Sequence, residues 1–337
     1  MTKSDRPTRI LLACPAETKQ IFSDIAPALR ARDLEVSQVY TEGYNSIDPG
    51  SWRSVDIAVS FGIPCGAGEM DAAPDLRALV VPTIGYDWID ASAATERGIL
   101  IANGVTPENY ESVAEAGILL ILAALYDLRG AEALLRGTGA RGRAQMLRGR
   151  TIGLVGYGHI ARALVDRLQG WGVDILVNRR STIHDDPRTR LAPLQELVET
   201  ADIIVIVADL NPSSQHLVGA AELARMKPGT VLVNLSRGGL IDEAALVRHQ
   251  SEGGGLRLAL DVFEREPLPM DSPLRGFEQA ILTPHCIAHT EECLAALPAS
   301  AIRNVFALIA GEIPASLCNP AALEKYEERF MHGHGRV

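Results

Sequence analysis

Short apolar runs alternate with amphipathic segments along the front third of the chain. Runs rich in aliphatic and β-branched residues predict strands at 9–15 (RILLACP), 34–40 (LEVSQVY), 55–62 (VDIAVSFG), 76–83 (LRALVVPT) and 98–104 (GILIANG). The segment 18–33, between the first two runs, has the apolar spacing of a helix. Strand–helix alternation of this kind predicts a parallel sheet with helices on both faces.

A second alternation of strand and helix patterns runs from Thr151 to about His285. Its predicted strands are TIGLVG (151–156), DILVN (174–178), ADIIVIVAD (201–209), TVLVNLS (230–236), LRLALDVF (256–263) and QAILTPH (279–285). The pattern predicts two α/β units, with the second inserted between the first and its C-terminal helices.

A long helix is predicted to begin at Thr106, which has the residue type of an N-cap, followed by Pro107 and Glu108 in the first turn. Its apolar part, 116–126, is too short to cross a bilayer and predicts a buried core helix. The Gly- and Arg-rich segment 129–150 has no clear period and predicts a solvated connection.

The last helical pattern, 290–311, contains Pro298, which is expected to break or kink the helix.

Composition narrows the class of protein. A chain of 337 residues is long for one core, and 47% hydrophobic with 22% charged residues is typical of a soluble globular protein. The net charge of −10 argues against a general nucleic-acid binder, although a few arginines can still hold a small anion. The five cysteines have no metal-ligand spacing, and the N-terminal apolar run is too short for a secretory signal, so we expect a cytoplasmic protein with neither a metal site nor a membrane partner.

The clearest motif is Gly156-Tyr157-Gly158-His159-Ile160-Ala161, which follows a predicted strand and opens a predicted helix. Gly156 permits a tight turn, and Gly158 lets the backbone approach a pyrophosphate. Ala161 replaces the third glycine of the motif, which is a permitted change. Because the helix start exposes backbone N–H groups, the segment predicts a dinucleotide site.

The acid that usually holds the ribose 2′-hydroxyl is missing about 20 residues further on, at the end of the second strand. Asn178, Arg179 and Arg180 stand there, and Asp174 begins that strand at the wrong end. Guanidinium groups match phosphate geometry, so the sequence favours NADP(H) as cofactor, with NAD(H) still possible.

Charged residues lie at or after the ends of three later strands, and parallel sheets bind ligands beyond the carboxyl ends of their strands. Arg237 follows one strand, Asp261, Glu264 and Glu266 follow the next, and His285 ends the last. A histidine can give a proton to a carbonyl oxygen that accepts a hydride at its carbon, and a carboxylate can orient that histidine and keep it protonated. An arginine can hold the substrate carboxylate. The set suits reduction of a 2-oxo acid.

At these positions the chain resembles the D-isomer-specific 2-hydroxyacid dehydrogenase family. The resemblance covers most of residues 55–311 and is carried by LVGYGHIA, MKPGTVLVNLSRGGLIDEAAL, LALDVFEREPLP, ILTPH and IGYDWIDASAATERGILIANGVTPENYESVAE. It implies an α/β fold of two doubly wound parallel-sheet domains: a Rossmann cofactor domain (106–289) inserted into a flavodoxin-like substrate domain (1–105 and 290–337). It also implies a homodimer with cofactor domains in contact.

The resemblance assigns roles residue by residue. Arg237 corresponds to the substrate-orienting arginine, Glu266 to the carboxylate that pairs with the catalytic histidine, and His285 to that histidine, the acid/base. The loop Phe61-Gly62-Ile63 resembles the one whose backbone amides receive the substrate carboxylate. Motif and resemblance together predict these cofactor contacts: Val113, Gly156, Tyr157, Gly158, His159, Ile160, Asn178, Arg179, Arg180, Ala208, Asp209, Leu235, Ser236, Arg237, Asp261, His285 and Ala288.

The sequence departs from the family pattern in several places. Arg179 stands where members that prefer NAD carry an acid, and Asp209 replaces a common proline. A run of small residues after the histidine becomes Cys286-Ile287-Ala288-His289, and the tryptophan often found before the glycine-rich strand is absent.

The expected function is an NADPH-dependent, D-isomer-specific reductase of a small 2-oxo acid, such as glyoxylate or hydroxypyruvate. Glu266 argues against a formate dehydrogenase. Two alternatives stay open: a dinucleotide-sensing regulatory protein resembling the family's co-repressors, and a phosphite-type dehydrogenase.

Overall fold

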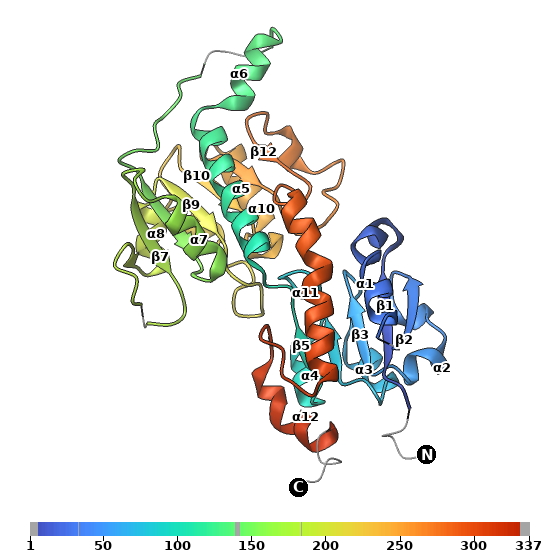
Figure 1. Cartoon of the computed structure of the whole chain (residues 1–337). Helices are drawn as coiled ribbons and strands as arrows, with labels where there is room; N and C mark the ends of the chain where they lie inside the picture. The colour runs from blue at the N-terminus through green and yellow to red at the C-terminus, as the bar shows by residue number, and fades with distance from the viewer. Residues whose placement is uncertain (1–5, 33, 139–141, 183, 331–337) are drawn as a thin grey trace. The chain divides into compact units, whose positions relative to one another are not determined.

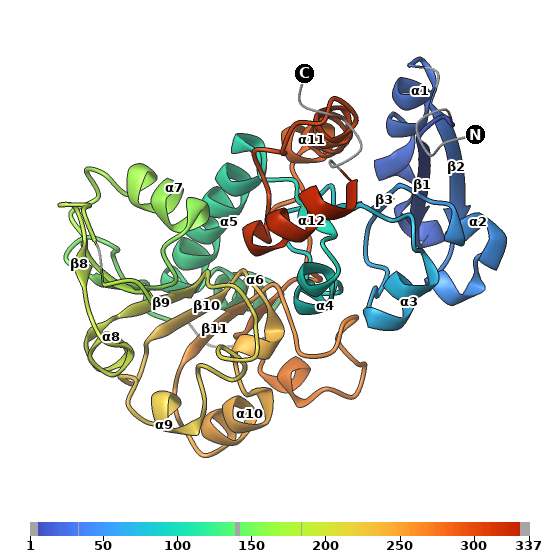
Figure 2. The ribbon, with the colours of Figure 1, turned by 90° about the horizontal axis from the view of Figure 1, so that it is seen from below.

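The computed structural model describes residues 6–32, 34–138, 142–182 and 184–330. The chain divides into two compact units (Figures 1 and 2): unit 1 is Met1–Asn109 with Glu291–Val337, and unit 2 is Tyr110–Thr290. The sequence predicted the same insertion, with boundaries after residues 105 and 289. Each unit consists of a sheet covered by helices, and each contains some of the predicted site residues.

Unit 1 contains a parallel sheet whose strands all fall inside the runs predicted from the sequence. The strands are β1 (Arg9–Cys14), β2 (Glu35–Tyr40), β3 (Ile57–Ser60), β4 (Ala78–Val80) and β5 (Leu100–Ala102). Their order is β2-β1-β3-β4-β5, the flavodoxin-like order. The residues of β3, β4 and β5 are all buried, because helices cover both faces of the sheet.

Helices of unit 1 lie on both faces of this sheet. They are α1 (Ile25–Arg30), α2 (Pro49–Arg53), α3 (Ala67–Ala72), α4 (Ala91–Glu96), α11 (Glu291–Ile309) and α12 (Leu323–Phe330), with 3-10 turns at Ala16–Phe22, Tyr44–Ser46 and Pro320–Ala322. The predicted helical segment 18–33 is therefore a 3-10 turn followed by a short α-helix.

The predicted break at Pro298 is wrong, because α11 runs through this residue without interruption. Its buried face, which includes Ala301, Val305 and Leu308, packs on the sheet of unit 1, and this burial holds the helix together across the missing N–H of the proline. By length and composition alone α11 is apolar enough to cross a membrane, as core helices of soluble proteins also can be.

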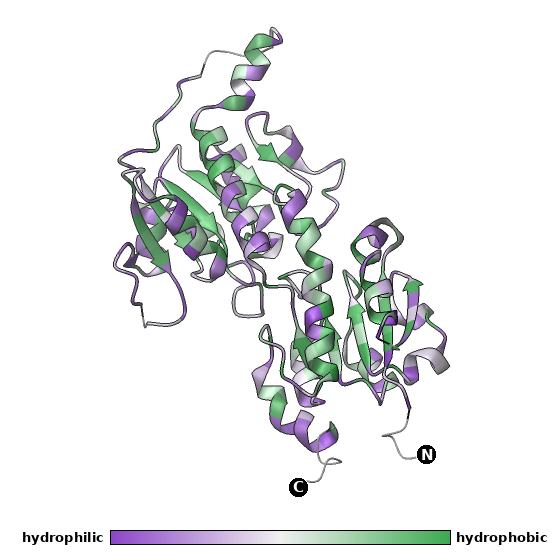
Figure 3. Ribbon diagram, in the orientation of Figure 1, coloured by the Kyte–Doolittle hydropathy of each residue, from purple (hydrophilic) through white to green (hydrophobic). Residues whose placement is uncertain are grey.

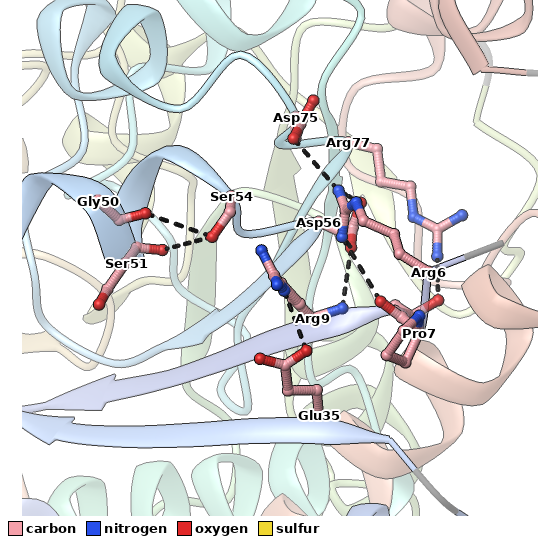
Figure 4. Close-up of polar contacts among 11 residues, drawn as sticks. Arg6, Pro7, Arg9, Glu35, Gly50, Ser51, Ser54, Asp56, Asp75 and Arg77 are labelled. Carbon is pink, nitrogen blue, oxygen red and sulfur yellow. Dashed lines mark hydrogen bonds and ion pairs between the residues drawn. The ribbon is translucent and has the colours of Figure 1, made fainter. Parts of the chain in front are cut away.

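A network of charged residues holds the amino ends of β1, β3 and β4 (Figure 4). The Arg6 guanidinium donates to both carboxylate oxygens of Asp56, at 2.7 and 2.9 Å, and to Asp75 at 3.2 Å. Asp56 also accepts the backbone N–H of Arg9 at 2.8 Å. These bonds tie the chain before β1 to the starts of two neighbouring strands.

Unit 2 contains a second parallel sheet with the order β12-β11-β10-β9-β6-β7-β8. Its strands are β6 (Thr151–Val155), β7 (Asp174–Asn178), β8 (Arg190–Leu191), β9 (Ile203–Ile206), β10 (Val231–Asn234), β11 (Arg257–Leu260) and β12 (Ile281–Leu282). This is the Rossmann order with one added strand, and the direction of the order reverses between β6 and β9. Ligands of such sheets bind beyond the carboxyl ends of the strands at this reversal.

The helices of unit 2 are α5 (Pro107–Leu125), α6 (Leu128–Leu135), α7 (His159–Arg167), α8 (Leu194–Thr200), α9 (Ala220–Leu223) and α10 (Glu243–Ser251), with 3-10 turns at Gly238–Leu240 and Pro273–Gly276. All of these helices except α6 pack on the sheet, which has a separate apolar core on each face. In Figure 3 the central strands of both sheets are mainly green, whereas many helices carry a purple face.

The long helix α5 starts as the sequence predicts, because the Thr106 hydroxyl accepts the N–H of Asn109 at 3.3 Å. Its apolar half is amphipathic rather than buried on every side. Leu120 and Ile121 are fully buried, but Leu119 is 52% exposed.

The segment 129–150 is not wholly an irregular connection, because α6 forms its first part. Asp127 caps this helix by accepting the N–H of Gly130 at 3.2 Å. None of the α6 residues is buried against the described chain, and in Figure 1 the helix extends away from the sheet of unit 2. The sequence did not predict this helix because no face of it packs on the core.

Candidate active site

The glycine turn has the two properties that its motif requires. Gly156 has φ +102°, and a Cβ there would lie 2.7 Å from the backbone of Val207 and Ala208, so only glycine fits. Gly158 precedes α7, and a Cβ on it would have no described atom within 4 Å. The space beside Gly158 is therefore open, as a motif that lets a pyrophosphate approach the backbone requires.

Tyr157, between these glycines, is buried and fixes the loop that follows β7. Its hydroxyl lies 2.5 Å from Asp186, which also pairs with Arg188 at 2.7 Å. The bonds from Arg188, opposed by burial and aided by the Tyr157 hydroxyl, lower the pKa of Asp186. Arg188 reaches in addition to Asp166 of α7, at 2.5 Å. The loop after β7 is thus tied to the turn and to the helix.

The predicted phosphate-binding residues lie at the end of β7 beside this tyrosine. The Asn178 carbonyl accepts the N–H of Gly156 at 2.9 Å, which joins the end of β7 to the glycine turn. The Arg179 guanidinium lies 5.9 Å from the centre of the Tyr157 ring, and Arg180 is exposed. Arg162 of α7, which sequence reasoning did not single out, lies 4.8 Å from the centre of the same ring.

The structure brings His285 and Glu266 together. His285 Nδ1 lies 2.8 Å from Glu266 Oε2, and the Phe263 N–H donates to Glu266 Oε1 at 3.0 Å. Burial alone would raise the pKa of Glu266, but the hydrogen bond and charge of His285, the Phe263 N–H and the charge of Arg237 together lower the pKa below its usual value. The carboxylate is therefore ionised at neutral pH and is held against the imidazole.

Arg237 approaches this pair because two loops meet backbone to backbone. It follows β10, and a Cβ on the next residue, Gly238, would lie 1.8 Å from the carbonyl carbon of Phe263. Only glycine permits this contact between the loops that follow β10 and β11. The Arg237 guanidinium donates to the Ser236 carbonyl at 2.7 Å, while Asn234 donates to the Arg237 carbonyl at 2.9 Å.

Asp261 builds the turn that presents the histidine. Its Oδ1 accepts the Thr283 hydroxyl at 2.6 Å and the N–H groups of Cys286 and Ile287 at 3.1 and 3.3 Å. Its carbonyl accepts the His285 N–H at 2.7 Å, and His285 itself has φ +52°. Sequence analysis predicted Asp261 only as a cofactor contact, whereas its bonds in the structure hold the turn that carries His285.

Other predicted cofactor positions lie in the elements that border this edge of unit 2. Val113, Ile160 and Ala288 are partly buried against the same core cluster that contains Leu235. The Ser236 hydroxyl donates to the Ala208 carbonyl.

The two remaining positions are exposed at the surface of unit 2. Asp209 accepts the Ser214 hydroxyl on its carbonyl at 2.7 Å. The His159 ring stacks on Tyr110 of α5, with centroids 5.2 Å apart.

The predicted substrate loop lies in unit 1, directly after β3. Gly62 has φ +68° and is exposed, and the Phe61 ring meets Trp88 edge-on at 5.7 Å. The Ile63 side chain is fully buried, so only its backbone is suited to contact a ligand.

Comparison with known proteins shows the family to which the chain belongs. Residues 118–286 match the model of the NAD-binding domain of D-isomer-specific 2-hydroxyacid dehydrogenases. The chain is 36% identical over 272 residues to a glyoxylate reductase of Thermofilum pendens, covering 77% of this chain and 79% of that protein. It is 30% identical over 315 residues to glyoxylate/hydroxypyruvate reductase B of Pectobacterium carotovorum, covering 90% and 98%.

A solved structure is similar over almost the whole chain. The NADPH-dependent glyoxylate/hydroxypyruvate reductase of Sinorhizobium meliloti, in complex with NADP and malonate, has a TM-score of 0.79 and 27% sequence identity. The similarity covers 94% of this chain and 98% of that one.

Proposed function

Because the chain belongs to the D-isomer-specific 2-hydroxyacid dehydrogenase family, we propose that it reduces small 2-oxo acids of the glyoxylate and hydroxypyruvate class with NADP(H). It is an NAD(P)-dependent oxidoreductase with two parallel-sheet α/β units. The observation that carries the proposal is the 2.8 Å contact between His285 and an ionised Glu266, with the charge of Arg237 acting on the same carboxylate.

When bound, the cofactor supplies the hydride that reduces the substrate carbonyl carbon. His285 gives a proton to the carbonyl oxygen from Nε2, the ring nitrogen that Glu266 does not bind. Glu266 holds Nδ1, which fixes the orientation of the ring. Arg237 binds the substrate carboxylate and draws charge toward the carbonyl oxygen.

The loop Phe61-Gly62-Ile63 is the proposed second contact for the substrate carboxylate. Gly62 has the left-handed backbone that turns successive N–H groups to one side of a loop. Because the Ile63 side chain belongs to the core, the loop offers backbone donors rather than side-chain ones.

The proposed preference for NADP(H) rests on the end of β7. Arg179 and Arg180 stand where an acid would hold an unphosphorylated ribose. Two acids follow on this loop: Asp185 is exposed, and Asp186 is buried and bound by Tyr157 and Arg188, so Asp186 is not free to accept a ribose hydroxyl.

Initial rates with both cofactors against a panel of 2-oxo acids test the proposal. We expect NADPH oxidation with glyoxylate and hydroxypyruvate, a D-configured product from the latter, and a higher kcat/KM with NADPH than with NADH. Tight dinucleotide binding without turnover would favour a sensor protein, and cofactor reduction by phosphite would favour a phosphite dehydrogenase; either result contradicts the proposal.

Arg179→Asp tests the cofactor preference separately. The new carboxylate repels a 2′-phosphate and can accept a ribose hydroxyl, so the kcat/KM ratio of NADPH to NADH should fall by about 10-fold or more. A wild-type protein that already prefers NADH would remove the phosphate argument while leaving the reductase activity intact.

We also propose a homodimer that uses the exposed helix α6. Leu128 and Leu135 of this helix and Tyr126 just before it are exposed, with Leu135 at 89%, and such apolar surface usually meets a partner. Sedimentation of the wild-type chain should give a dimer, and Leu135→Glu should shift it toward the monomer. An unchanged dimer in this variant would exclude α6 from the contact.

A further inference from the structure

We infer that Arg162 of α7 is a further specificity-determining residue, which contacts the 2′-phosphate of NADP(H) together with Arg179. The inference rests on the proposed cofactor preference and extends it from the loop after β7 to the helix that follows the glycine turn. Arg162 lies outside the residues that the motif and the family resemblance indicated.

The first observation is that one aromatic ring positions two cations from different elements. The guanidinium carbons of Arg162 and Arg179 lie 4.8 and 5.9 Å from the centre of the Tyr157 ring. Both distances are within the range in which a ring face attracts a cation. The contact between the Tyr157 hydroxyl and Asp186 holds the ring in one orientation.

The second observation is the balance of charge around this ring. Asp186 on the loop and Asp166 on the helix are both bound by Arg188, and the other acid of the loop, Asp185, is exposed. Across the described part of the chain, no carboxylate lies within ion-pair distance of Arg162 or Arg179. Two guanidinium groups therefore gather beside one ring without a bound counter-charge, and an anion would complete the cluster.

The third observation is the position of this cluster relative to the glycine turn. Tyr157 lies between Gly156 and Gly158, and Arg162 lies one helical turn after Gly158. In a Rossmann domain the pyrophosphate lies at the helix start and the ribose 2′ position lies at the end of the second strand, here β7. A 2′-phosphate at that point meets Arg179 from the strand end and Arg162 from the helix.

Equilibrium binding to the full-length protein tests the inference without any turnover. Dissociation constants are measured by calorimetry for four ligands: NADPH, NADH, 2′,5′-ADP and 5′-AMP. Arg162→Gln removes the cation at an exposed position, and Arg162→Lys keeps the charge without the planar fork. Arg167→Gln is the matched control, because Arg167 lies on the same helix but pairs with Glu111 and Glu115.

We expect Arg162→Gln to weaken binding of NADPH and 2′,5′-ADP by about 10-fold, a typical loss for one charge-assisted phosphate contact. NADH and 5′-AMP should bind within about twofold of wild type, since they carry no 2′-phosphate. Arg162→Lys should fall between, and Arg167→Gln should match wild type for all four ligands.

Two outcomes overturn the inference and are distinguishable from each other. If wild type prefers NADPH but Arg162→Gln binds all four ligands as wild type does, or weakens all of them equally, only the role of Arg162 fails. If wild type binds 2′,5′-ADP no better than 5′-AMP, the phosphate site itself is absent, and the proposed cofactor preference fails with it.

Discussion

Two charged clusters at opposite ends of parallel strands show how similar residues take different roles. At the amino ends of the unit 1 strands, Asp56 binds Arg6 through both carboxylate oxygens. At the carboxyl ends of the unit 2 strands, Glu266 binds the imidazole of His285 through one oxygen. Each carboxylate also accepts a backbone N–H, from Arg9 and from Phe263 respectively.

The difference lies in the partner rather than in the carboxylate. A guanidinium stays protonated in proteins and uses both of its outer nitrogens on Asp56, so the unit 1 cluster can only hold the strands. An imidazole titrates near neutral pH and has a second ring nitrogen. Because the His285 side chain is 42% exposed, its proton can be exchanged with a ligand, which makes the unit 2 cluster suited to chemistry.

The largest expected effect is that of His285→Ala, which removes the titratable partner. Turnover with NADPH and hydroxypyruvate should fall about 100-fold or more, because the proton donor is lost. The dissociation constant for NADPH and the melting temperature should stay close to wild type, since the side chain is partly exposed. Turnover within threefold of wild type would contradict the assignment.

Asp261→Ala should give the next largest effect, because it removes the acceptor of the Thr283, Cys286 and Ile287 donors. An orphaned buried donor costs about 1–3 kcal/mol, so the turn carrying His285 should loosen and turnover should fall about 10-fold or more. Asp261→Asn keeps one carbonyl oxygen as acceptor and should recover part of the loss. Equal activity of the two variants would argue against this positioning role.

Arg6→Ala tests the unit 1 cluster. The free energy of unfolding should change, and kcat should not. Urea unfolding should show a loss of about 1–2 kcal/mol, since Arg6 and Asp56 are largely buried and bidentate. Arg9→Ala is the matched control: its pair with Glu35 is exposed and should cost about 0.5 kcal/mol or less. A fall in kcat for Arg6→Ala at unchanged stability would contradict the claim that the unit 1 cluster serves stability and not catalysis.

The smallest expected effect concerns acid pH. The pKa of Glu266 lies below its ordinary value of 4.5, so the carboxylate form persists where a free glutamate is already half protonated. The contribution of the Glu266 carboxylate to activity is present above pH 4.5 and is lost only as the pH falls through the lowered pKa. The acid limb of the kcat/KM profile for hydroxypyruvate reduction should therefore have its midpoint below pH 4.5. A midpoint at or above pH 4.5 would contradict the lowered pKa.

The parts of the fold that follow from local patterns could be predicted from the sequence. The buried strands of both sheets are runs of aliphatic residues, and Gly156 and Gly158 mark the turn at β6. The helix α6 was missed because its apolar residues face no core within the described chain. The break at Pro298 was wrongly predicted, because the packing of α11 on its sheet outweighs the lost hydrogen bond.

The site followed a similar division. Strand ends share one edge, so the positions of Arg237, His285 and the acids after β11 predicted that they meet, and the family resemblance singled out Glu266 among those acids. The links that position them depend on contacts between distant segments: Asp261 with the His285 turn, and Gly238 with Phe263. The grouping of Arg162 with Arg179 likewise depends on the placement of Tyr157, and no local pattern records it.

A double-mutant cycle on Glu266 and His285 tests most directly that the two side chains act as one acid/base unit. The measurement is kcat/KM for hydroxypyruvate reduction by wild type, Glu266→Gln, His285→Ala and the double variant. If Glu266 acts through the imidazole, the double variant should be no slower than His285→Ala alone. If the two losses multiply instead, the residues act independently, and the account of this site is contradicted.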